Sequence, residues 1–125
     1  MQLTITRDAA QVACLCVGVA DTEDERTLGL TGDGDPAPFD GLAFLWQEPT
    51  RPGFWMKDTK GPLDVVFVGE DGIVSGVQTM PGCSTEPCQV FSAPGVVDFA
   101  VEVRDAAAVP LQRGDTAVLE GSCER

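Results

Sequence analysis

The sequence predicts a mainly β protein, in the form of a small compact β-barrel or sandwich with one short helix. Its apolar segments are short and rich in β-branched residues, and clusters of glycine, proline and aspartate separate them. Helical periodicity is confined to one segment near residues 22–30. Because short strands of this kind must pair off their edges, a closed or two-layered arrangement is favoured over an open sheet.

The whole chain, residues 1–125, is expected to form one domain. Its length is typical of a single domain, and a content of 43% hydrophobic and 22% charged residues is typical of globular proteins. A chain of this size buries a core without needing disulfides or metals to hold it together.

The N-terminal part predicts one strand and one helix. Residues 12–20 are apolar on both alternating faces, which is typical of a buried strand. Thr22 and, three residues later, Glu25 form a capping-box pattern, so a short helix is expected near residues 22–30. Within this helix, Leu28 is expected to face the core.

The middle of the chain predicts an exposed loop and three strands. Residues 31–40 contain two glycines, two prolines and three aspartates, so neither helix nor strand continues through them and an acidic loop is expected. Residues 41–46 form a compact apolar strand that ends at a polar break over residues 48–52. Residues 63–68 and 73–78 flank a four-residue connection suited to a β-hairpin.

The C-terminal part predicts two further strands. In residues 97–103 apolar residues alternate with polar or small ones, which predicts one buried face and places Glu102 on the opposite face. Residues 105–109 are compatible with one helical turn. Gly114 is expected to supply the φ of a turn that leads into a short strand over residues 116–119.

The charge of the chain excludes several classes of partner. Twenty acidic residues against eight basic ones give a net charge of −12, and the basic residues are scattered. Since nucleic acids and anionic lipids bind through clustered cationic groups, neither is expected as a partner. No apolar stretch approaches the roughly 20 residues that span a bilayer. The first residues lack the basic and then apolar order of a secretory signal, which predicts a cytoplasmic protein unless a leader has been removed from an exported one.

The composition also removes the common catalytic constellations. The chain contains no histidine and no tyrosine, which excludes Ser-His-Asp and Cys-His catalysis and histidine metal ligands. It has no nucleophile elbow, phosphate-binding loop or dinucleotide fingerprint. We therefore predict a non-catalytic protein without a cofactor or a metal site.

The five cysteines leave at least one thiol unpaired within the chain, since their number is odd. Cys14 and Cys16 share one face of the first strand and are expected to be small apolar core residues. Cys83 and Cys88 close a short loop that contains proline, where a disulfide is expected to hold the turn. A thiol redox site or a metal site at Cys83 and Cys88 is the alternative, which the acidic Glu86 between them disfavours.

The segment from Phe54 to Lys57 carries the leading functional hypothesis. Aromatic and thioether groups beside a few polar ones are the usual composition of a recognition cleft. We therefore expect a small molecule or a peptide to bind Phe54, Trp55, Met56, Lys57 and Asp64. Alternatively, Trp55 and Met56 fill the core, and a third interpretation makes the chain a protein interaction module without a pocket.

Asp64 interrupts an apolar strand, and an unpaired buried carboxylate is too costly to remain ionised. We expect it to be largely buried and bonded either to Lys57 or to hydroxyl and backbone groups of residues 58–61. A structural clamp and a ligand-binding role are both consistent with this position.

The most distinctive string in the chain is Phe54-Trp55-Met56-Lys57-Asp58-Thr59, followed by Pro62-Leu63-Asp64 and an apolar strand. It is similar to the central signature of the domain of unknown function 192 family, and the motif order over about residues 17–119 resembles that family as well. The resemblance implies a compact, mainly β fold, occurrence in bacteria and archaea, and frequent export or lipid anchoring. It implies no activity. Asp58 and Thr31 depart from the asparagine and methionine that are usual at these positions.

Overall fold

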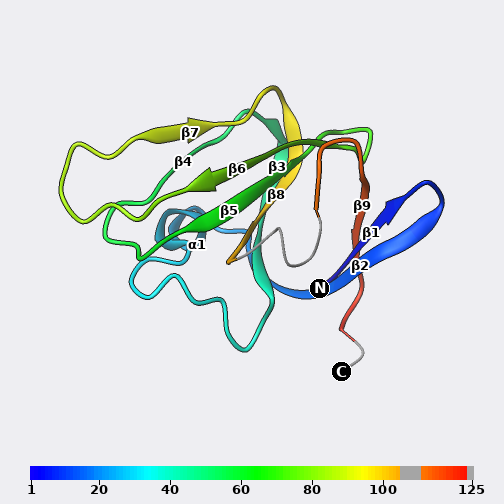
Figure 1. Ribbon diagram of the computed structural model, residues 1–125, viewed down its shortest axis with the longest axis horizontal. Coiled ribbons are helices and arrows are strands. Elements are labelled where there is room, and N and C mark those ends of the chain that lie inside the picture. The colour runs from blue at the N-terminus through cyan, green and yellow to red at the C-terminus, as the bar shows by residue number, and fades with distance from the viewer. Residues whose placement is uncertain (105–110, 124–125) are drawn as a thin grey trace.

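The computed structural model describes residues 1–104 and 111–123 of the chain. Within them the chain forms one short helix and nine strands (Figure 1). In chain order the elements are β1 (Gln2–Arg7), β2 (Ala10–Ala20), α1 (Glu23–Leu28), β3 (Gly41–Thr50), β4 (Gly53–Trp55), β5 (Leu63–Val68), β6 (Val74–Met80), β7 (Val90–Ser92), β8 (Val97–Val103) and β9 (Thr116–Glu120). The predicted mainly β fold with one short helix is confirmed. The helical turn expected at residues 105–109 lies outside the described residues.

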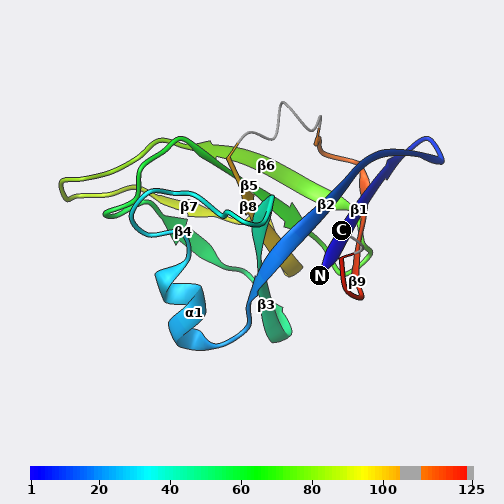
Figure 2. The same ribbon diagram turned by 90° about the horizontal axis from the view of Figure 1, so that it is seen from below.

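Seven of the strands form one sheet, in the order β6-β5-β8-β3-β2-β1-β9. β2 and β3 pair in parallel, and the other neighbouring strands pair antiparallel. The sheet curls into a half-barrel, which brings β9 towards the turn between β5 and β6 (Figure 1 and Figure 2). Two backbone hydrogen bonds mark this approach, from Val74 to the Asp115 carbonyl and from Ala117 to the Gly72 carbonyl, both 2.8 Å.

Two apolar cores lie on the two faces of this sheet. The first is built from all seven strands and fills the inside of the curl, with Leu3, Ile5 and Val17 among its fully buried members. The second lies between the other face of the sheet and a two-stranded ribbon of β4 and β7. The Phe54 ring of this ribbon packs edge-on against Phe44 of the sheet, with ring centroids 5.0 Å apart.

Strand β8 separates the two cores. The alternation of its sequence predicted one buried face with Glu102 on the other, and this prediction is wrong because the ribbon covers the second face as well. Val101 and Val103 enter the first core, while Ala100 enters the second. Asp98 is the one exposed residue of the strand, and Glu102 is only 4% exposed. A carboxyl group is therefore buried where the sequence placed it in solvent.

A hairpin of β1 and β2 begins the fold, and its first strand was not predicted. The turn residues Asp8 and Ala9 both have positive φ, at 53° and 65°, as a type I′ turn requires. This pair lacks the glycine that usually signals such a turn, so the hairpin could not be predicted from local sequence.

Strand β2 is buried less completely than predicted. Leu15 and Val17 point into the first core, but Cys14 is exposed and Cys16 is half-buried. The expectation that both cysteines are core residues is therefore wrong. Both cysteines lie on the face of β2 opposite Leu15 and Val17, where Cys14 meets solvent and Cys16 is joined to Cys123 by a disulfide.

Helix α1 starts at the capping box that the sequence predicted. The Thr22 hydroxyl accepts a hydrogen bond from the Glu25 amide, and the Glu25 carboxylate accepts one from the Thr22 amide, both at 3.1 Å. The expected core contact of Leu28 is wrong, since this side chain is 64% exposed. The helix has six residues and buries none of them.

The strand predictions in the middle of the chain are confirmed with one extension. β5 and β6 form the expected hairpin. β3 begins at Gly41 as expected but runs to Thr50, through the predicted polar break at residues 48–52. Its pairing with β8 shifts register between Leu45 and Thr50, and an irregularity of this kind lets a strand accommodate Pro49.

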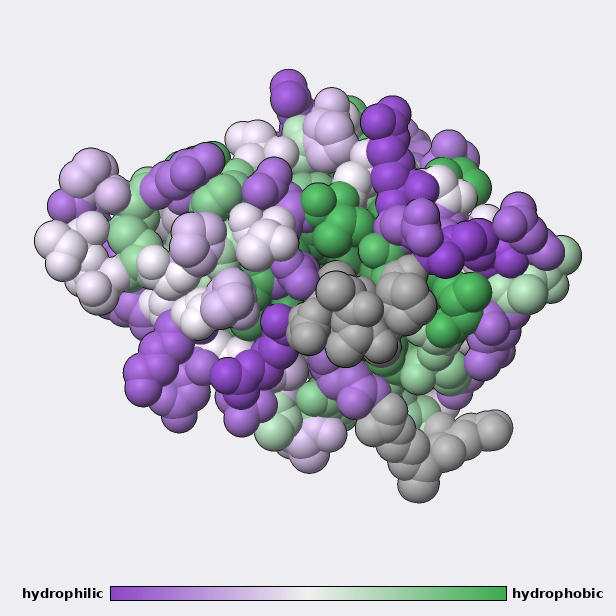
Figure 3. All heavy atoms as spheres, in the orientation of Figure 1, coloured by the Kyte–Doolittle hydropathy of each residue, from purple (hydrophilic) through white to green (hydrophobic). Residues whose placement is uncertain are grey.

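The loop of residues 31–40 is exposed over most of its length, as the sequence predicted. Backbone hydrogen bonds from Gly32 to the Asp58 carbonyl and from Lys60 to the Gly32 carbonyl hold it beside the segment after β4. Hydrophilic side chains cover much of the face shown in Figure 3, and apolar side chains reach the surface in separate areas.

An ion pair between the part-exposed Arg7 and the buried Asp115 connects the start of the sheet to the segment before its last strand. The guanidinium of Arg7 in β1 donates two hydrogen bonds to the carboxylate of Asp115, at 2.7 and 2.8 Å, and the Gln112 amide donates a third at 3.0 Å. Arg7 therefore holds the pKa of the Asp115 carboxyl below its ordinary value. Gly114 has a φ of 95°, which confirms the turn predicted before β9.

Replacing this carboxylate should destabilise the fold. We expect Asp115→Asn to lower the free energy of unfolding near neutral pH by about 2–3 kcal/mol, because Arg7 loses its ionic partner. The loss is smaller than for a fully buried pair because Arg7 is part-exposed. A carboxyl with a lowered pKa stabilises the fold above its ordinary pKa of about 3.9, and this stabilisation is lost as the pH falls through the folded value. Urea unfolding at neutral and acidic pH measures this difference. Asp98→Asn, at an exposed position, is the control; an equal effect of both substitutions would contradict the account.

Candidate functional site

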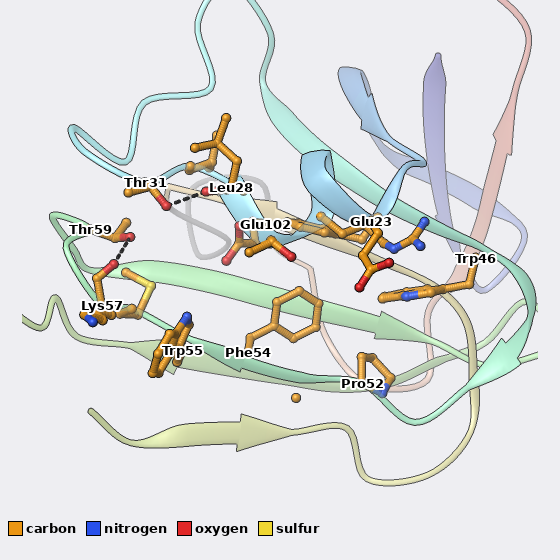
Figure 4. Close-up of a pocket in the computed structure, with 17 residues that line it drawn as sticks. Glu23, Leu28, Thr31, Trp46, Pro52, Phe54, Trp55, Lys57, Thr59 and Glu102 are labelled. Atoms are coloured by element: carbon orange, nitrogen blue, oxygen red, sulfur yellow. Dashed lines mark hydrogen bonds between the residues drawn. The ribbon is translucent and has the colours of Figure 1, made fainter. Parts of the chain in front are cut away.

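A cavity of about 380 Å³ lies between helix α1, with the turn that follows it, and residues 52–57, which include β4. Figure 4 shows Leu28 and Glu23 along one side, Trp55, Phe54 and Trp46 along the other, and Glu102 between them. Its volume lies in the usual range for small-ligand sites, about 300–1,000 Å³. Four aromatic side chains, Phe44, Trp46, Phe54 and Trp55, line the cavity together with charged and hydroxyl groups.

The strand β4 builds the aromatic wall by ordinary alternation. Phe54 points into the second core and is 9% exposed, whereas its neighbour Trp55 is 51% exposed. Met56 is 1% exposed and packs in the second core. Gly53 permits the close pairing with β7, because a Cβ there would lie 2.8 Å from Val90.

Four of the five residues that the sequence proposed for ligand binding line this cavity: Phe54, Trp55, Met56 and Lys57. The alternative that Trp55 and Met56 both fill the core fits Met56 but not the half-exposed Trp55. Asp64 is not among the lining residues.

Asp64 lies on β5 and is half-buried rather than largely buried. Its carboxylate accepts a hydrogen bond of 2.6 Å from the hydroxyl of Thr79, which is its partner across the strand pair in β6. Neither Lys57 nor residues 58–61 supply this bond. The sequence could not name Thr79, because the partner depends on the register of the hairpin.

Glu102 is the functional candidate that the sequence missed. It lies on β8, and its carboxyl forms no hydrogen bond or ion pair within the part of the chain that the structure describes. Burial therefore raises the pKa of Glu102 to about 7. The signal in the sequence was a single acidic residue within an otherwise apolar segment, and its meaning depended on what covers the strand.

The end of α1 lies next to this carboxyl at a glycine. Gly29 follows the helix with a φ of 49°, a conformation that side chains rarely adopt. A Cβ at this position would lie 3.5 Å from Glu102 Oε1 and 3.5 Å from the Phe44 ring. The glycine therefore lets the helix end sit against the cavity without covering the acid with a side chain.

The two cations of the cavity wall are engaged at its rim. Arg26 donates a hydrogen bond of 2.8 Å to the Leu45 carbonyl, and its guanidinium lies 5.9 Å from the centre of the Trp46 ring. Lys57 lies 2.7 Å from the Glu86 carboxylate and 5.6 Å from the centre of the Trp55 ring. The hydrogen bond to Glu86 raises the pKa of Lys57.

Two disulfides are present, between Cys83 and Cys88 and between Cys16 and Cys123. The Cα atoms of Cys83 and Cys88 are 6.0 Å apart. Their loop carries Glu86 to Lys57, and the Cys83 carbonyl accepts a hydrogen bond of 2.9 Å from the Asp58 amide. The small disulfide loop therefore supports one rim of the cavity.

Residues 1–104 and 111–123 contain neither a cluster of metal-binding side chains nor a membrane-spanning helix. No group of three or more cysteine, aspartate or glutamate side chains comes together there in a way that could hold a metal ion. No helix in this part of the chain has the length and apolar character needed to cross a membrane.

The model of the family described as Uncharacterized ACR, also called DUF192, matches residues 4–118. The chain belongs to the DUF192 family. No curated protein matches this DUF192 chain. A solved protein of unknown function from Novosphingobium aromaticivorans is 27% identical, with a TM-score of 0.75 over 94% of this chain and 84% of the other. A Sinorhizobium meliloti protein, provisionally described as a transcription regulator, is 21% identical, with a TM-score of 0.78 over 94% and 91%.

Removing the charge of Glu102 should stabilise this DUF192 protein above neutral pH. A carboxyl whose pKa is raised by folding destabilises the fold once it ionises, so its cost grows as the pH rises from its ordinary value towards about 7. We expect Glu102→Gln to raise the free energy of unfolding by about 2–3 kcal/mol near pH 8 and by almost nothing near pH 4.

Urea unfolding of both proteins across this pH range measures the effect. Glu23→Gln provides a matched control, since Glu23 lines the same cavity but is exposed. A stability difference between wild type and Glu102→Gln that does not change with pH would show that Glu102 has no raised pKa.

Proposed function

We propose that this DUF192 chain is a non-catalytic binding domain that takes a small molecule or a peptide segment into the cavity between α1 and β4. The observation that carries this proposal is the cavity itself, which joins a half-exposed tryptophan to a buried polar group. Aromatic surface beside a few polar groups is typical of recognition sites.

Three features of the wall support a recognition role. Trp55 presents a large exposed aromatic surface, which contributes much binding area at a low cost in conformational entropy. The disulfide loop and the Lys57–Glu86 ion pair hold one rim in place. The aromatic contacts of Phe54 with Phe44 and Phe67 hold the floor of the ribbon. A wall that is fixed before binding loses little freedom when a ligand enters.

The charge of this chain does not favour direct contact with nucleic acid. The net charge of −12 opposes the phosphate backbone, and direct binding to nucleic acid depends on neutralising phosphates with lysine and arginine.

Amide-resolved NMR spectra of the full chain, recorded with a panel of small aromatic and aliphatic fragments, test this proposal. We expect the fragments that bind to shift the signals of Gly29, Trp46, Phe54 and Trp55, which surround the cavity. Trp55→Ala should weaken these fragments by about fivefold or more, because a truncated tryptophan removes much of the contact area.

The control is Val118→Ala, at an exposed apolar position of β9 outside the cavity lining. It should leave fragment affinity unchanged. Fragment binding confined to other surfaces, or no binding by any fragment, would overturn the proposed function and favour an interaction module without a pocket.

A further inference from the structure

The Glu102 carboxyl is a polar group for which the described structure supplies no partner. It is 4% exposed and faces the cavity, yet no donor within residues 1–104 or 111–123 reaches it. Its oxygens open only onto the cavity, since no fully buried side-chain oxygen of the described residues lacks a partner. A carboxylate in so confined a position is poorly solvated, so a ligand that brings a donor gains from bonding to it. A ligand that also brings a positive charge gains most, since charge-assisted hydrogen bonds are the strongest.

The two cations that line the cavity, Arg26 and Lys57, bond to other groups. Arg26 bonds to a backbone carbonyl beside Trp46, and Lys57 pairs with Glu86 at 2.7 Å. Both therefore lie at the rim against an aromatic ring rather than at Glu102. No cation among the described residues pairs with Glu102, so we look to a ligand for the positive charge that would complement this acid.

The aromatic walls favour the same kind of ligand. Trp46, Phe54 and Trp55 line the path to Glu102, and aromatic faces attract organic cations while also accommodating apolar stems. The two rim cations already show this affinity, at 5.9 and 5.6 Å from their tryptophan rings. A cavity of about 380 Å³ has room for an alkyl chain as well as its charged end.

We propose, building on the proposed function, that the cavity binds an organic cation with N–H donors on an apolar stem and that the Glu102 carboxylate receives its charged end. The chemical class comprises primary ammonium and guanidinium groups, whether on a free amine or on a lysine or arginine side chain of a peptide. Quaternary ammonium ions lie outside this class, because they carry charge but no N–H group to satisfy the carboxylate.

The affinity for such a cation should depend on pH. Glu102 must be ionised to receive a cation, so binding should weaken as the pH falls below about 7, where the free carboxyl takes up a proton. The other charged groups that line the cavity are Glu23 and Arg26 of α1 and Lys57 after β4, while the residues opposite Glu102 in β3 and β5 are apolar.

The test uses four probes with the same stem: n-butylammonium, n-butylguanidinium, n-butyltrimethylammonium and n-butanol. NMR titration of the full chain near pH 8 should show the two N–H cations binding at the cavity at least about tenfold more tightly than the other two. Glu102→Gln should abolish this preference. Glu23→Gln, which removes the exposed acid of the same cavity, should retain it. Repetition near pH 5.5 should weaken the N–H cations in the wild type by about tenfold or more.

A lysine-containing tripeptide with blocked ends, compared with n-butylammonium, separates the two sources of the cation. Tighter binding of the tripeptide indicates a peptide ligand, and tighter binding of the free amine indicates a small molecule. Equal affinities for all four stem probes, or an unchanged preference in Glu102→Gln, would overturn the amine proposal.

The failure of this proposal is distinguishable from that of the proposed function. If fragments bind at the cavity but the N–H cations have no advantage, the cavity binds another class of ligand. If neither fragments nor cations bind there, both proposals fail. Amide spectra of Glu102→Gln, compared with those of the wild type, show whether the variant is folded in each case.

Discussion

The pairing of β8 with β3 on one side and β5 on the other is the constraint on which the rest of the structure depends. A strand with two partners has no free edge, and here the half-barrel core covers one of its faces while the β4–β7 ribbon covers the other. Residues along it should be apolar or small for this reason. Glu102 departs from that expectation in the second core, at the place where the cavity beside α1 reaches the sheet.

Two carboxyls among the described residues are buried, and their environments are opposite. Asp115 receives two hydrogen bonds from Arg7 and one from Gln112, and its pKa is lowered. Glu102 receives none from the described residues, and burial raises its pKa to about 7. The first carboxyl joins the two ends of the sheet and stabilises the fold. The second stabilises nothing that the structure shows, and groups that cost stability in this way are commonly retained for function.

Local patterns carried most of what the sequence could predict. The capping box of Thr22 and Glu25 fixed the start of α1, and the glycine-flanked connection between β5 and β6 fixed their hairpin, because both depend on residues a few positions apart. The segment from Phe54 to Lys57 was found by its composition, and the structure places it on the cavity wall.

The remaining features depend on contacts between distant segments. Glu102 looked solvent-exposed because the sequence of β8 alternates, and nothing nearby in the chain indicates that other segments cover the second face of this strand. Cys16 looked like a core residue because free cysteine is usually buried, and its disulfide partner, Cys123, lies 107 residues away in the sequence. Burial of a second face and pairing across the chain are tertiary properties, which periodicity alone does not specify.

The ionisation of Glu102 in the free protein tests the central claim most directly. Carboxyl carbon shifts of the chain labelled with ¹³C at glutamate, followed by NMR from about pH 3 to pH 9 and assigned by comparison with Glu102→Gln, give this value without any ligand. The account predicts one glutamate that titrates near pH 7, as the burial of Glu102 requires. A signal of Glu102 that titrates at its ordinary value of about 4.3 would show that the carboxyl is solvated or already partnered, and would contradict the account.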